Sequence, residues 1–336
     1  MAKIAVIGAG SWGTAVAIQL SFNPETKTTL WVYEEDVFQQ LSQQQQNIKY
    51  LPGVQIPHQL EFSLDLEDVV KDAEIIFNVV PSHIVRGMMK KMKPYIKSDV
   101  IIVSLSKGIE NDTLMRMSEV IHQETNIPFE NIVVLSGPSH AEEVARNIPT
   151  ALVSASVNLR HAERIQQILS SPTLRIYTAD DVIGTEVGGS VKNVIAIASG
   201  ICDGAGFGDN TKAALITRGL AEITRLGVAM GAQATTFAGL SGIGDLVVTC
   251  MSKHSRNRYV GEEIGRGKTL SDVLDHMNMV AEGVKTTRSV FELSRKFDIE
   301  MPISQKVYEV LFNEKDPIEE VTELMLREPK REQFGQ

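Results

Sequence analysis

The sequence has few cysteines, no excess of basic residues and no long apolar run. Its two cysteines, Cys202 and Cys250, stand far apart and outside any Cys/His ligand spacing, which argues against a zinc site and a disulfide framework. Acidic residues outnumber basic ones by 42 to 33, and this balance argues against nucleic acid as a partner. No apolar stretch approaches the roughly 18 residues that span a bilayer, and the glycine-punctuated start is not typical of a signal peptide. We expect a cytoplasmic protein without membrane insertion and without a metal site.

Short β-branched runs alternate with helical patterns through the first half of the chain. Strands are expected at 4–7, 28–32, 74–80, 100–105, 132–135 and 151–153. This alternation predicts βαβ units and therefore a parallel sheet. After about residue 180 the strand signals end, and helices are expected at 182–201, 212–230, 269–277, 285–297, 304–312 and 318–326. We predict an α/β domain, residues 1–180, followed by an all-α domain, residues 181–336.

Residues 8–13 read G-x-G-x-x-G between an expected strand and an expected helix. Gly8 permits the tight turn, Gly10 lets a pyrophosphate approach the backbone, and Gly13 lets the helix pack on the strand. The helix N-terminus then offers N–H groups and its positive dipole end to the phosphates. The pattern predicts a Rossmann-type dinucleotide site. A glycine-rich turn without a ligand is the alternative, and the strand and helix in register count against it.

Glu34 and Glu35 follow the second expected strand, about 20 residues after the glycines. An acidic residue there accepts hydrogen bonds from the adenosine ribose and favours NAD, and no Lys or Arg stands at 31–36 to pair with a 2′-phosphate. The other interpretation is that both carboxylates only begin the next helix, where the helix dipole favours acids. The sequence leaves both open. NAD is the preferred cofactor, with NADP as the alternative.

Polar groups interrupt the helical half at three places. Lys192 follows two glycines and stands among Val and Ile residues, where its pKa can be lowered, although a single Lys more often reaches solvent. Asp245 lies between a glycine-rich turn and an apolar run, either as a site carboxylate or as a helix cap. Ser255, Arg256 and Asn257 open an expected helix and form either a phosphate cradle or an ordinary capped surface turn.

A long ordered set of segments carries a family resemblance. These segments are GAGSWGTAVA at 8–17, SLSKGIE at 104–110, LSGPSHAEEVA at 135–145, EVGGSVKNVIAIASGICDGAGFGDNTKAALITRG at 186–219, GLSGIGDLVVTCMSKHSRNRYVG at 239–261 and VAEGVKTT at 280–287. In them the chain resembles the NAD(P)-dependent glycerol-3-phosphate dehydrogenases over essentially its whole length. The resemblance implies reduction of dihydroxyacetone phosphate, a small phosphorylated substrate, to sn-glycerol 3-phosphate for glycerophospholipid synthesis. It also implies a homodimer.

The resemblance assigns a role to each matching residue, with Lys192 as the catalytic proton donor and acceptor. The implied substrate contacts are Lys107, Gly137, Ser139, Lys192, Asp245, Ser255, Arg256 and Asn257. The implied cofactor contacts, which include the fingerprint glycines, are Gly8, Gly10, Ser11, Trp12, Gly13, Tyr33, Lys107, Ala141, Arg256, Val280 and Glu282. Two positions depart from the common pattern. His140 replaces a Phe, and WVYEED around Tyr33 resembles the NAD-using cytosolic eukaryotic enzymes, where many bacterial members carry a basic residue.

Two other functions fit part of the pattern. The β-hydroxyacid dehydrogenases, including 6-phosphogluconate dehydrogenase, share the two domains and a lysine after a glycine-rich helical segment, but the SKHSRNR and GLSGIGD segments do not look like theirs. A nicotinamide-binding sensor without catalysis would need neither Lys192 nor Asp245. Consumption of NADH with dihydroxyacetone phosphate discriminates between these functions.

Overall fold

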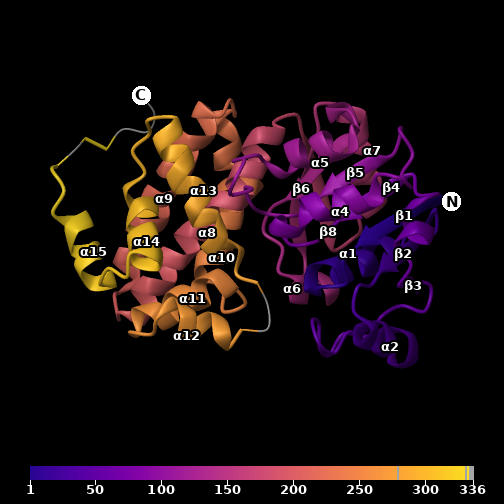
Figure 1. The fold of residues 1–336 in the computed structure, drawn as a ribbon, viewed down its shortest axis with the longest axis horizontal. Helices are drawn as coiled ribbons and strands as arrows, with labels where there is room; N and C mark the ends of the chain where they lie inside the picture. The colour runs from indigo at the N-terminus through magenta and orange to yellow at the C-terminus, as the bar shows by residue number, and fades with distance from the viewer. Residues whose placement is uncertain (278–279, 330, 333–336) are drawn as a thin grey trace. The chain divides into compact units, whose positions relative to one another are not determined.

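The chain forms two compact units in a computed structural model that describes residues 1–277, 280–329 and 331–332 (Figure 1). The first unit comprises residues 1–106 and 117–182 and contains the sheet. The second comprises residues 107–116 and 183–336 and is helical. The predicted fold class, a Rossmann-type parallel sheet followed by an all-α part, is confirmed.

One eight-stranded sheet forms the first unit, in the order β3-β2-β1-β4-β5-β6-β7-β8. The strands are β1 (Ala2–Ile7), β2 (Thr26–Trp31), β3 (Glu61–Ser63), β4 (Ile75–Asn78), β5 (Ile101–Ser104), β6 (Ile132–Ser136), β7 (Thr150–Ala155) and β8 (Leu174–Ala179). The strands β1 to β6 run parallel, whereas β7 pairs antiparallel with β6 and parallel with β8. The order reverses between β1 and β4, and open α/β sheets bind ligands at such a point, outside the carboxyl ends of their strands.

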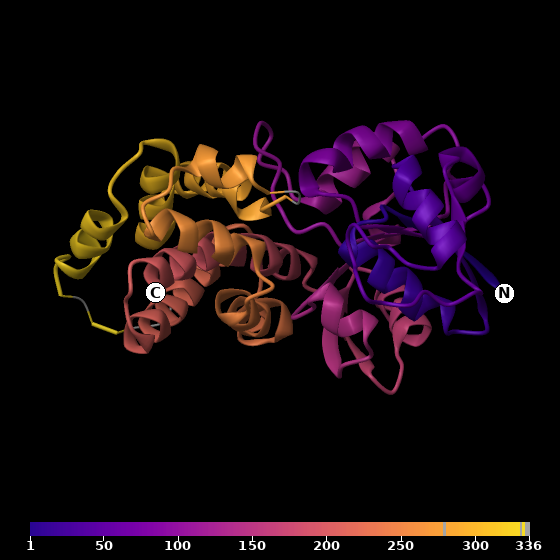
Figure 2. The same cartoon turned by 90° about the horizontal axis from the view of Figure 1, so that it is seen from below.

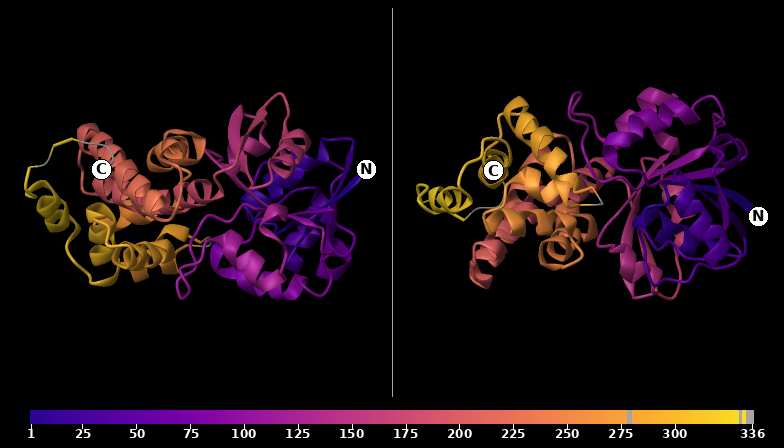
Figure 3. Two further views of the ribbon diagram at one scale, coloured as in Figure 1. Left: turned by 90° about the horizontal axis from the view of Figure 1, so that it is seen from above. Right: turned by 60° about the horizontal axis from the view of Figure 1, so that its bottom comes forward.

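Helices cover both faces of this sheet (Figure 3). They are α1 (Ser11–Ser21), α2 (Glu35–Gln44), α3 (Leu66–Val70), α4 (Val85–Met92), α5 (Met117–Thr125), α6 (Ala141–Ala145) and α7 (Leu159–Leu169). Helix α1 packs with α6 and α7, and α4 packs with α3 and α5. Because both faces are covered, β4, β5 and β6 are buried at every residue and read as continuous apolar runs that end in a polar residue.

The second unit is built around a long buried helix, α8 (Val182–Gly204) (Figure 2). The others are α9 (Asp209–Ala229), α10 (Asp245–Met251), α11 (Arg256–Gly265), α12 (Leu270–Asp275), α13 (Glu282–Lys296), α14 (Pro302–Phe312) and α15 (Pro317–Met325). A helix that is apolar on most sides lies in a core, and α8 does so here. Its only lysine, Lys192, is therefore held inside the unit.

Most of the predicted elements are present, with bounds shifted by a few residues. The sequence reading missed β3, which has three residues, and β8, whose side chains alternate between buried and exposed. It also missed the short helices α3, α4, α6 and α10. The predicted boundary near residue 180 leaves residues 107–116 with the sheet, whereas in the structure they pack with the helical unit.

Candidate functional site

The glycine loop after β1 forms an open backbone cradle. Gly8 has a φ of +110°, and a Cβ on Gly13 would lie 1.8 Å from the Gly8 carbonyl oxygen, so both positions require glycine. A Cβ on Gly10 would meet no atom within 4 Å. Gly10 precedes α1, and no side chain caps this helix N-terminus. The backbone there is accessible to an anionic group such as a pyrophosphate.

Buried polar side chains end three neighbouring strands at the carboxyl edge of the sheet. Asn78, Ser104 and Ser136 are the last residues of β4, β5 and β6 and are at most 3% exposed. Each has a side-chain oxygen that accepts or donates no hydrogen bond among the described residues. Buried polar groups are normally satisfied, so these oxygens indicate a water or a ligand group at this edge. The sequence reading missed them, although a polar residue closing an apolar strand was the available signal.

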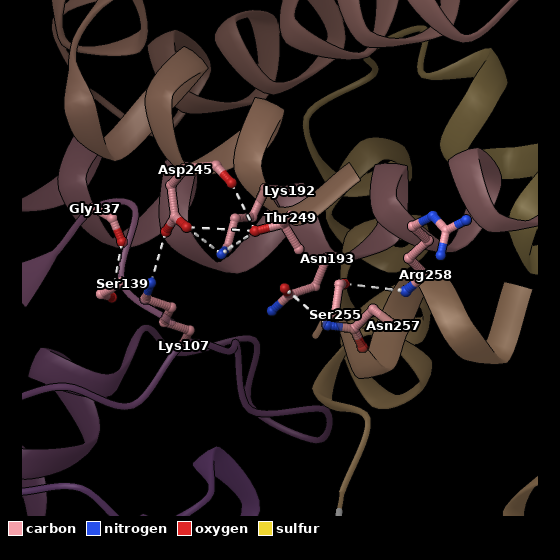
Figure 4. A network of polar contacts seen from close by, with 10 residues as sticks. All are labelled: Lys107, Gly137, Ser139, Lys192, Asn193, Asp245, Thr249, Ser255, Asn257 and Arg258. Carbon is pink, nitrogen blue, oxygen red and sulfur yellow. Dashed lines mark hydrogen bonds and ion pairs between the residues drawn. The ribbon is translucent and has the colours of Figure 1, made fainter. Parts of the chain in front are cut away.

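In the second unit, two lysines meet one carboxylate (Figure 4). Lys192 donates to Asp245 Oδ1, and Lys107 Nζ lies 2.7 Å from Asp245 Oδ2. Lys192 Nζ also lies 2.7 Å from Thr249 Oγ1, and that hydroxyl donates to the Asp245 carbonyl oxygen at 2.6 Å. Lys192 is 5% and Asp245 1% exposed. Lys192 does not reach solvent, so that interpretation of it is wrong. Asp245 does not cap α10 either, because Gly244 is the residue that precedes this helix.

Burial and charge act in opposite directions on this cluster. Burial lowers the pKa of Lys192 to about 8, although the Asp245 carboxylate raises it, and Lys107 adds to the lowering. Burial by itself would raise the pKa of Asp245, but Lys107 and Lys192 together hold that pKa below its usual range. An ammonium with a pKa near 8 beside a permanent carboxylate can both donate and regain a proton near neutral pH.

Thr249 is a member of the cluster that the sequence reading missed. It stands four residues after Asp245 on α10, and residues at this spacing share a helix face. Its Oγ1 accepts a hydrogen bond from Lys192, so it fixes the direction of the ammonium. The helical spacing from Asp245 was the signal that could have found it.

A close backbone contact explains one of the two glycines that precede Lys192. A Cβ on Gly188 would lie 2.3 Å from the Ser241 carbonyl oxygen, in the π-helical turn Leu240–Gly244 that leads into α10. This contact brings α8 next to the start of α10, where Asp245 stands. Gly188 is therefore a position at which another backbone segment approaches α8 closely.

Residues 107–116 form an arm that holds Lys107 in the helical unit. Arg116 forms a partly buried ion pair with Glu186 on α8, at 2.6 Å. Ser289 on α13 donates to the Ile109 carbonyl oxygen at 3.0 Å, and an antiparallel bridge joins Ile109 to Arg116. These contacts explain how Lys107 reaches Asp245 across 138 residues of sequence.

The segment at 255–257 begins α11 as predicted. Ser255 caps this helix, with its hydroxyl accepting from the Arg258 N–H at 3.2 Å. Arg256 donates to the Val280 carbonyl oxygen at 3.1 Å. Asn257 donates to Asn193 Oδ1 at 2.9 Å and accepts from the Gly283 N–H at 2.8 Å.

These contacts tie the start of α11 to the segment that carries the predicted cofactor contacts Val280 and Glu282. Val280 is 37% exposed, and Glu282 is the first residue of α13. Asn257 also joins α11 to α8 through Asn193, the neighbour of Lys192. The structure thus brings together Lys107, Lys192 and Asp245, and it brings Arg256 and Asn257 to the 280–283 segment.

The remaining predicted site residues lie in the first unit. Gly137 follows β6 with a φ of +132°, and Ser139 donates to its carbonyl oxygen at 3.0 Å. His140 precedes α6, which begins at the buried Ala141. Tyr33 follows β2 and is 75% exposed, an unusual exposure for so large an aromatic side chain.

Three further residues, Ser11, Trp12 and Glu34, lie in or just after the loops that follow β1 and β2. Ser11 is buried, and Trp12 packs partly buried against the core. Glu34 precedes α2, and its side chain caps no N–H of that helix. Its carboxylate pairs instead with Lys49, at 2.7 Å. A cation therefore reaches this position from outside 31–36.

Two features are absent from residues 1–277, 280–329 and 331–332. No helix there is long and apolar enough to cross a membrane. In the same residues, no group of three or more His, Cys, Asp or Glu side chains is arranged to hold a metal ion.

Comparisons with known proteins cover nearly the whole chain. The family model described as NAD-dependent glycerol-3-phosphate dehydrogenase N-terminus matches residues 3–162, and the corresponding C-terminus model matches residues 181–322. A protein of Thermoanaerobacter sp. named glycerol-3-phosphate dehydrogenase (NAD(P)+) is 50% identical over 99% of this chain and 99% of its own length. One of Prosthecochloris aestuarii with the same name is 50% identical over 98% of this chain and 99% of its own. A crystal structure of glycerol-3-phosphate dehydrogenase from Coxiella burnetii is similar with a TM-score of 0.91 and 38% identity, over 96% of this chain and 98% of that one.

Proposed function

The chain belongs to the NAD-dependent glycerol-3-phosphate dehydrogenase family, and on this premise we propose that it reduces dihydroxyacetone phosphate to sn-glycerol 3-phosphate. NADH is the preferred hydride donor and NADPH the alternative. The observation that carries the proposal is the buried ammonium of Lys192, held by Asp245 and Thr249 with Lys107 on the same carboxylate. A reduction needs such a positioned proton donor, and a binding protein does not.

The residues of the first unit fit a nicotinamide dinucleotide. The open position at Gly10 and the uncapped N-terminus of α1 suit its pyrophosphate. The unpartnered oxygens of Asn78, Ser104 and Ser136 supply polar groups at the carboxyl edge, where ligands of this fold bind. We propose Ser11, Trp12, Tyr33, Ala141, Val280 and Glu282 as further cofactor contacts, with Lys107 and Arg256 shared between cofactor and substrate.

The proposed mechanism divides the chemistry between cofactor and protein. When bound, the reduced nicotinamide supplies a hydride to the carbonyl carbon. Lys192 donates a proton to the carbonyl oxygen as negative charge develops on it, and the hydroxyl of the product forms. Asp245 and Thr249 hold the ammonium in one direction, while burial keeps its pKa near 8. In the oxidation direction the neutral amine of Lys192 accepts the proton.

The start of α11 is proposed to bind the substrate phosphate. Arg256 offers a planar set of donors that suits a phosphate, and Ser255 and Asn257 add donors beside the helix N-terminus. Gly137 and Ser139 are proposed as further substrate contacts. Most of the proposed dinucleotide contacts lie in the first unit, residues 1–106 and 117–182, and the proposed proton chemistry lies in the second, residues 107–116 and 183–336. A cytoplasmic homodimer that supplies glycerophospholipid synthesis completes the proposal, and light scattering on the purified protein tests the dimer.

Initial rates with purified protein test the activity. NADH should be consumed with dihydroxyacetone phosphate, and NAD+ or NADP+ should not be reduced with 6-phosphogluconate or another β-hydroxyacid. Turnover of a β-hydroxyacid, without turnover of dihydroxyacetone phosphate, would assign the chain another reaction. Binding of NADH without turnover of any of these substrates would favour a sensor.

A further inference from the structure

A cation lies beside the acidic residue that follows β2, although none is near it in sequence. Lys49 stands in the connection between α2 and β3, with its Nζ 2.7 Å from Glu34 Oε1 and 3.4 Å from Asp36 Oδ2. Tyr50 donates its hydroxyl to the same Glu34 oxygen at 3.0 Å. The Lys49 ammonium also lies 5.4 Å from the centre of the Tyr50 ring. These four side chains, Glu34, Asp36, Lys49 and Tyr50, are called the Glu34 cluster below.

The backbone that carries Lys49 is fixed to the glycine loop. Asn47 is fully buried and donates to the Ala9 carbonyl oxygen and to Thr14 Oγ1, both at 2.8 Å. Its Oδ1 accepts from the Tyr50 N–H at 3.1 Å, and a bridge pairs Asn47 with Leu51. Lys49 is therefore not a surface lysine on an independent loop. Its position is set by the same residues that form the turn between β1 and α1.

The Glu34 carboxylate has two possible partners, the hydroxyls of an adenosine ribose and the Lys49 ammonium. This carboxylate is at the position where this fold accepts hydrogen bonds from the adenosine ribose. At the same time its hydrogen bond to Lys49 raises the pKa of that ammonium, so Lys49 stays charged at neutral pH. Lys49 and Glu34 side chains are 39% and 33% exposed, so an approaching ligand can reach both.

We propose that Glu34 sets the preference for NADH over NADPH by occupying Lys49, and that Lys49 is a latent partner for a 2′-phosphate. The Glu34 carboxylate repels this phosphate and also neutralises the cation that would bind it. The Glu34 carboxylate now lies 2.7 Å from the Lys49 ammonium. Without the charge of this carboxylate, a 2′-phosphate that binds at the same position would contact the Lys49 ammonium. The inference rests on the proposed function, because it assumes a nicotinamide dinucleotide bound at the glycine loop.

Equilibrium binding of NADH and NADPH, followed by protein and nucleotide fluorescence, tests the inference without turnover. Wild type should bind NADH at least about tenfold more tightly than NADPH, about 1.4 kcal/mol. Glu34→Gln keeps an acceptor for Tyr50 and should tighten NADPH binding about tenfold or more, because it removes the nearer of the two carboxylates that pair with Lys49 and leaves Asp36 at 3.4 Å. Glu34→Gln with Lys49→Ala should lose that gain, while its NADH affinity stays close to that of Glu34→Gln.

Two variants control for charge alone. Glu35→Gln removes the same charge from the next residue, which is exposed at the start of α2, and should change the NADPH to NADH affinity ratio less than about threefold. Lys27→Ala removes a cation near the amino end of β2, where it pairs with Glu61, and should leave the gain of Glu34→Gln intact.

Three outcomes overturn the inference. The first is equal NADPH affinity in Glu34→Gln with and without Lys49→Ala, and the second is equal effects of Glu35→Gln and Glu34→Gln. In both cases the proposed function stands if NADH still drives reduction of dihydroxyacetone phosphate. The third is a wild type that binds neither nucleotide, which would overturn the proposed function as well.

Discussion

At the scale of single residues, Lys192 is the proposed proton donor, so its pKa should set the pH range in which the protein reduces its substrate. Burial lowers this pKa to about 8, and only the ammonium form can donate a proton. We expect kcat/KM for reduction to be constant below about pH 8 and to fall above it, and kcat/KM for oxidation to rise through the same pH. Asp245→Asn removes a carboxylate that raises this pKa, so its residual reduction should fall at a lower pH. A reduction profile of Asp245→Asn that falls at a higher pH than the wild-type profile would contradict this account.

Arg256 is expected to recognise the substrate through its phosphate. Losing a charge-assisted hydrogen bond of this kind typically costs about 1.5–3 kcal/mol, or roughly 10- to 150-fold. Arg256→Ala should reduce kcat/KM for dihydroxyacetone phosphate by such a factor and affect unphosphorylated dihydroxyacetone much less. Lys253→Ala, which removes an exposed cation three residues earlier, is the control and should have little effect. If both substrates lose the same factor, Arg256 acts on the cofactor or on the 280–283 segment instead.

At the scale of helices and strands, a backbone contact at Gly188 sets the distance between α8 and α10. A Cβ there would lie 2.3 Å from the Ser241 carbonyl oxygen, so Gly188→Ala must push the two segments apart. We expect a loss of about 1–3 kcal/mol in the free energy of unfolding and reduced turnover, since Lys192 and Asp245 lie on these two helices. Denaturant unfolding measures the first effect.

Gly87→Ala is the matched control, because Gly87 lies within α4 and a Cβ there would meet nothing within 4 Å. Alanine should stabilise that helix by about 0.5–1 kcal/mol. A Gly188→Ala variant as stable as Gly87→Ala would show that the contact with Ser241 is not tight.

The N-terminus of α14 is capped by the buried carboxylate of Glu222 on α9. Because this carboxylate is buried, the free energy of unfolding should depend on pH. Glu222 on α9 accepts from the Ile303 N–H at 2.6 Å and the Ser304 N–H at 3.1 Å, and burial raises its pKa from 4.5 to about 7. Between these values the folded state keeps a proton that the unfolded state loses, so stability falls as the pH rises through this window.

The expected size of this change is about 3 kcal/mol between pH 4.5 and 7, since one pKa unit corresponds to about 1.4 kcal/mol. The free energy of unfolding of wild type relative to Glu222→Gln should fall by this amount across the window and level off above pH 7. Glu292→Gln, which removes an exposed carboxylate from α13, is the control. Parallel curves for wild type and Glu222→Gln would contradict the assignment.

The elements that the sequence predicted well are those whose pattern is local. The buried strands β4 to β6 read as apolar runs, and the Ser255 cap before α11 was recognisable from residue type alone. Strand β8 was missed because one of its faces is exposed and polar. The pairing of Lys107 with Asp245 was available only through the family resemblance, since 138 residues separate them. The Lys49–Glu34 pair was not foreseen, because it depends on how Asn47 folds its loop onto the glycine loop.

At the scale of the whole molecule, the dinucleotide features and the proton chemistry belong to different compact units. The glycine loop and the Glu34 cluster lie in the first unit, and Lys192 and Asp245 lie in the second. Lys107 belongs to the second unit because residues 107–116 pack there. Lys192 lies in the second unit and is not among the proposed cofactor contacts, so its substitution should leave nucleotide binding intact, and the two properties can be measured separately.

The most direct test of the central claim measures NADH binding and turnover on Lys192→Ala. Lys107 remains beside Asp245 in this variant, so the carboxylate keeps a partner and the fold should be preserved. We predict a dissociation constant for NADH close to wild type and a kcat lower by at least about a hundredfold. Lys192→Arg should also be poor, because guanidinium does not release a proton at neutral pH. Near-normal turnover of Lys192→Ala with NADH binding intact would contradict the account and assign the proton to another group, with Lys107 the next candidate.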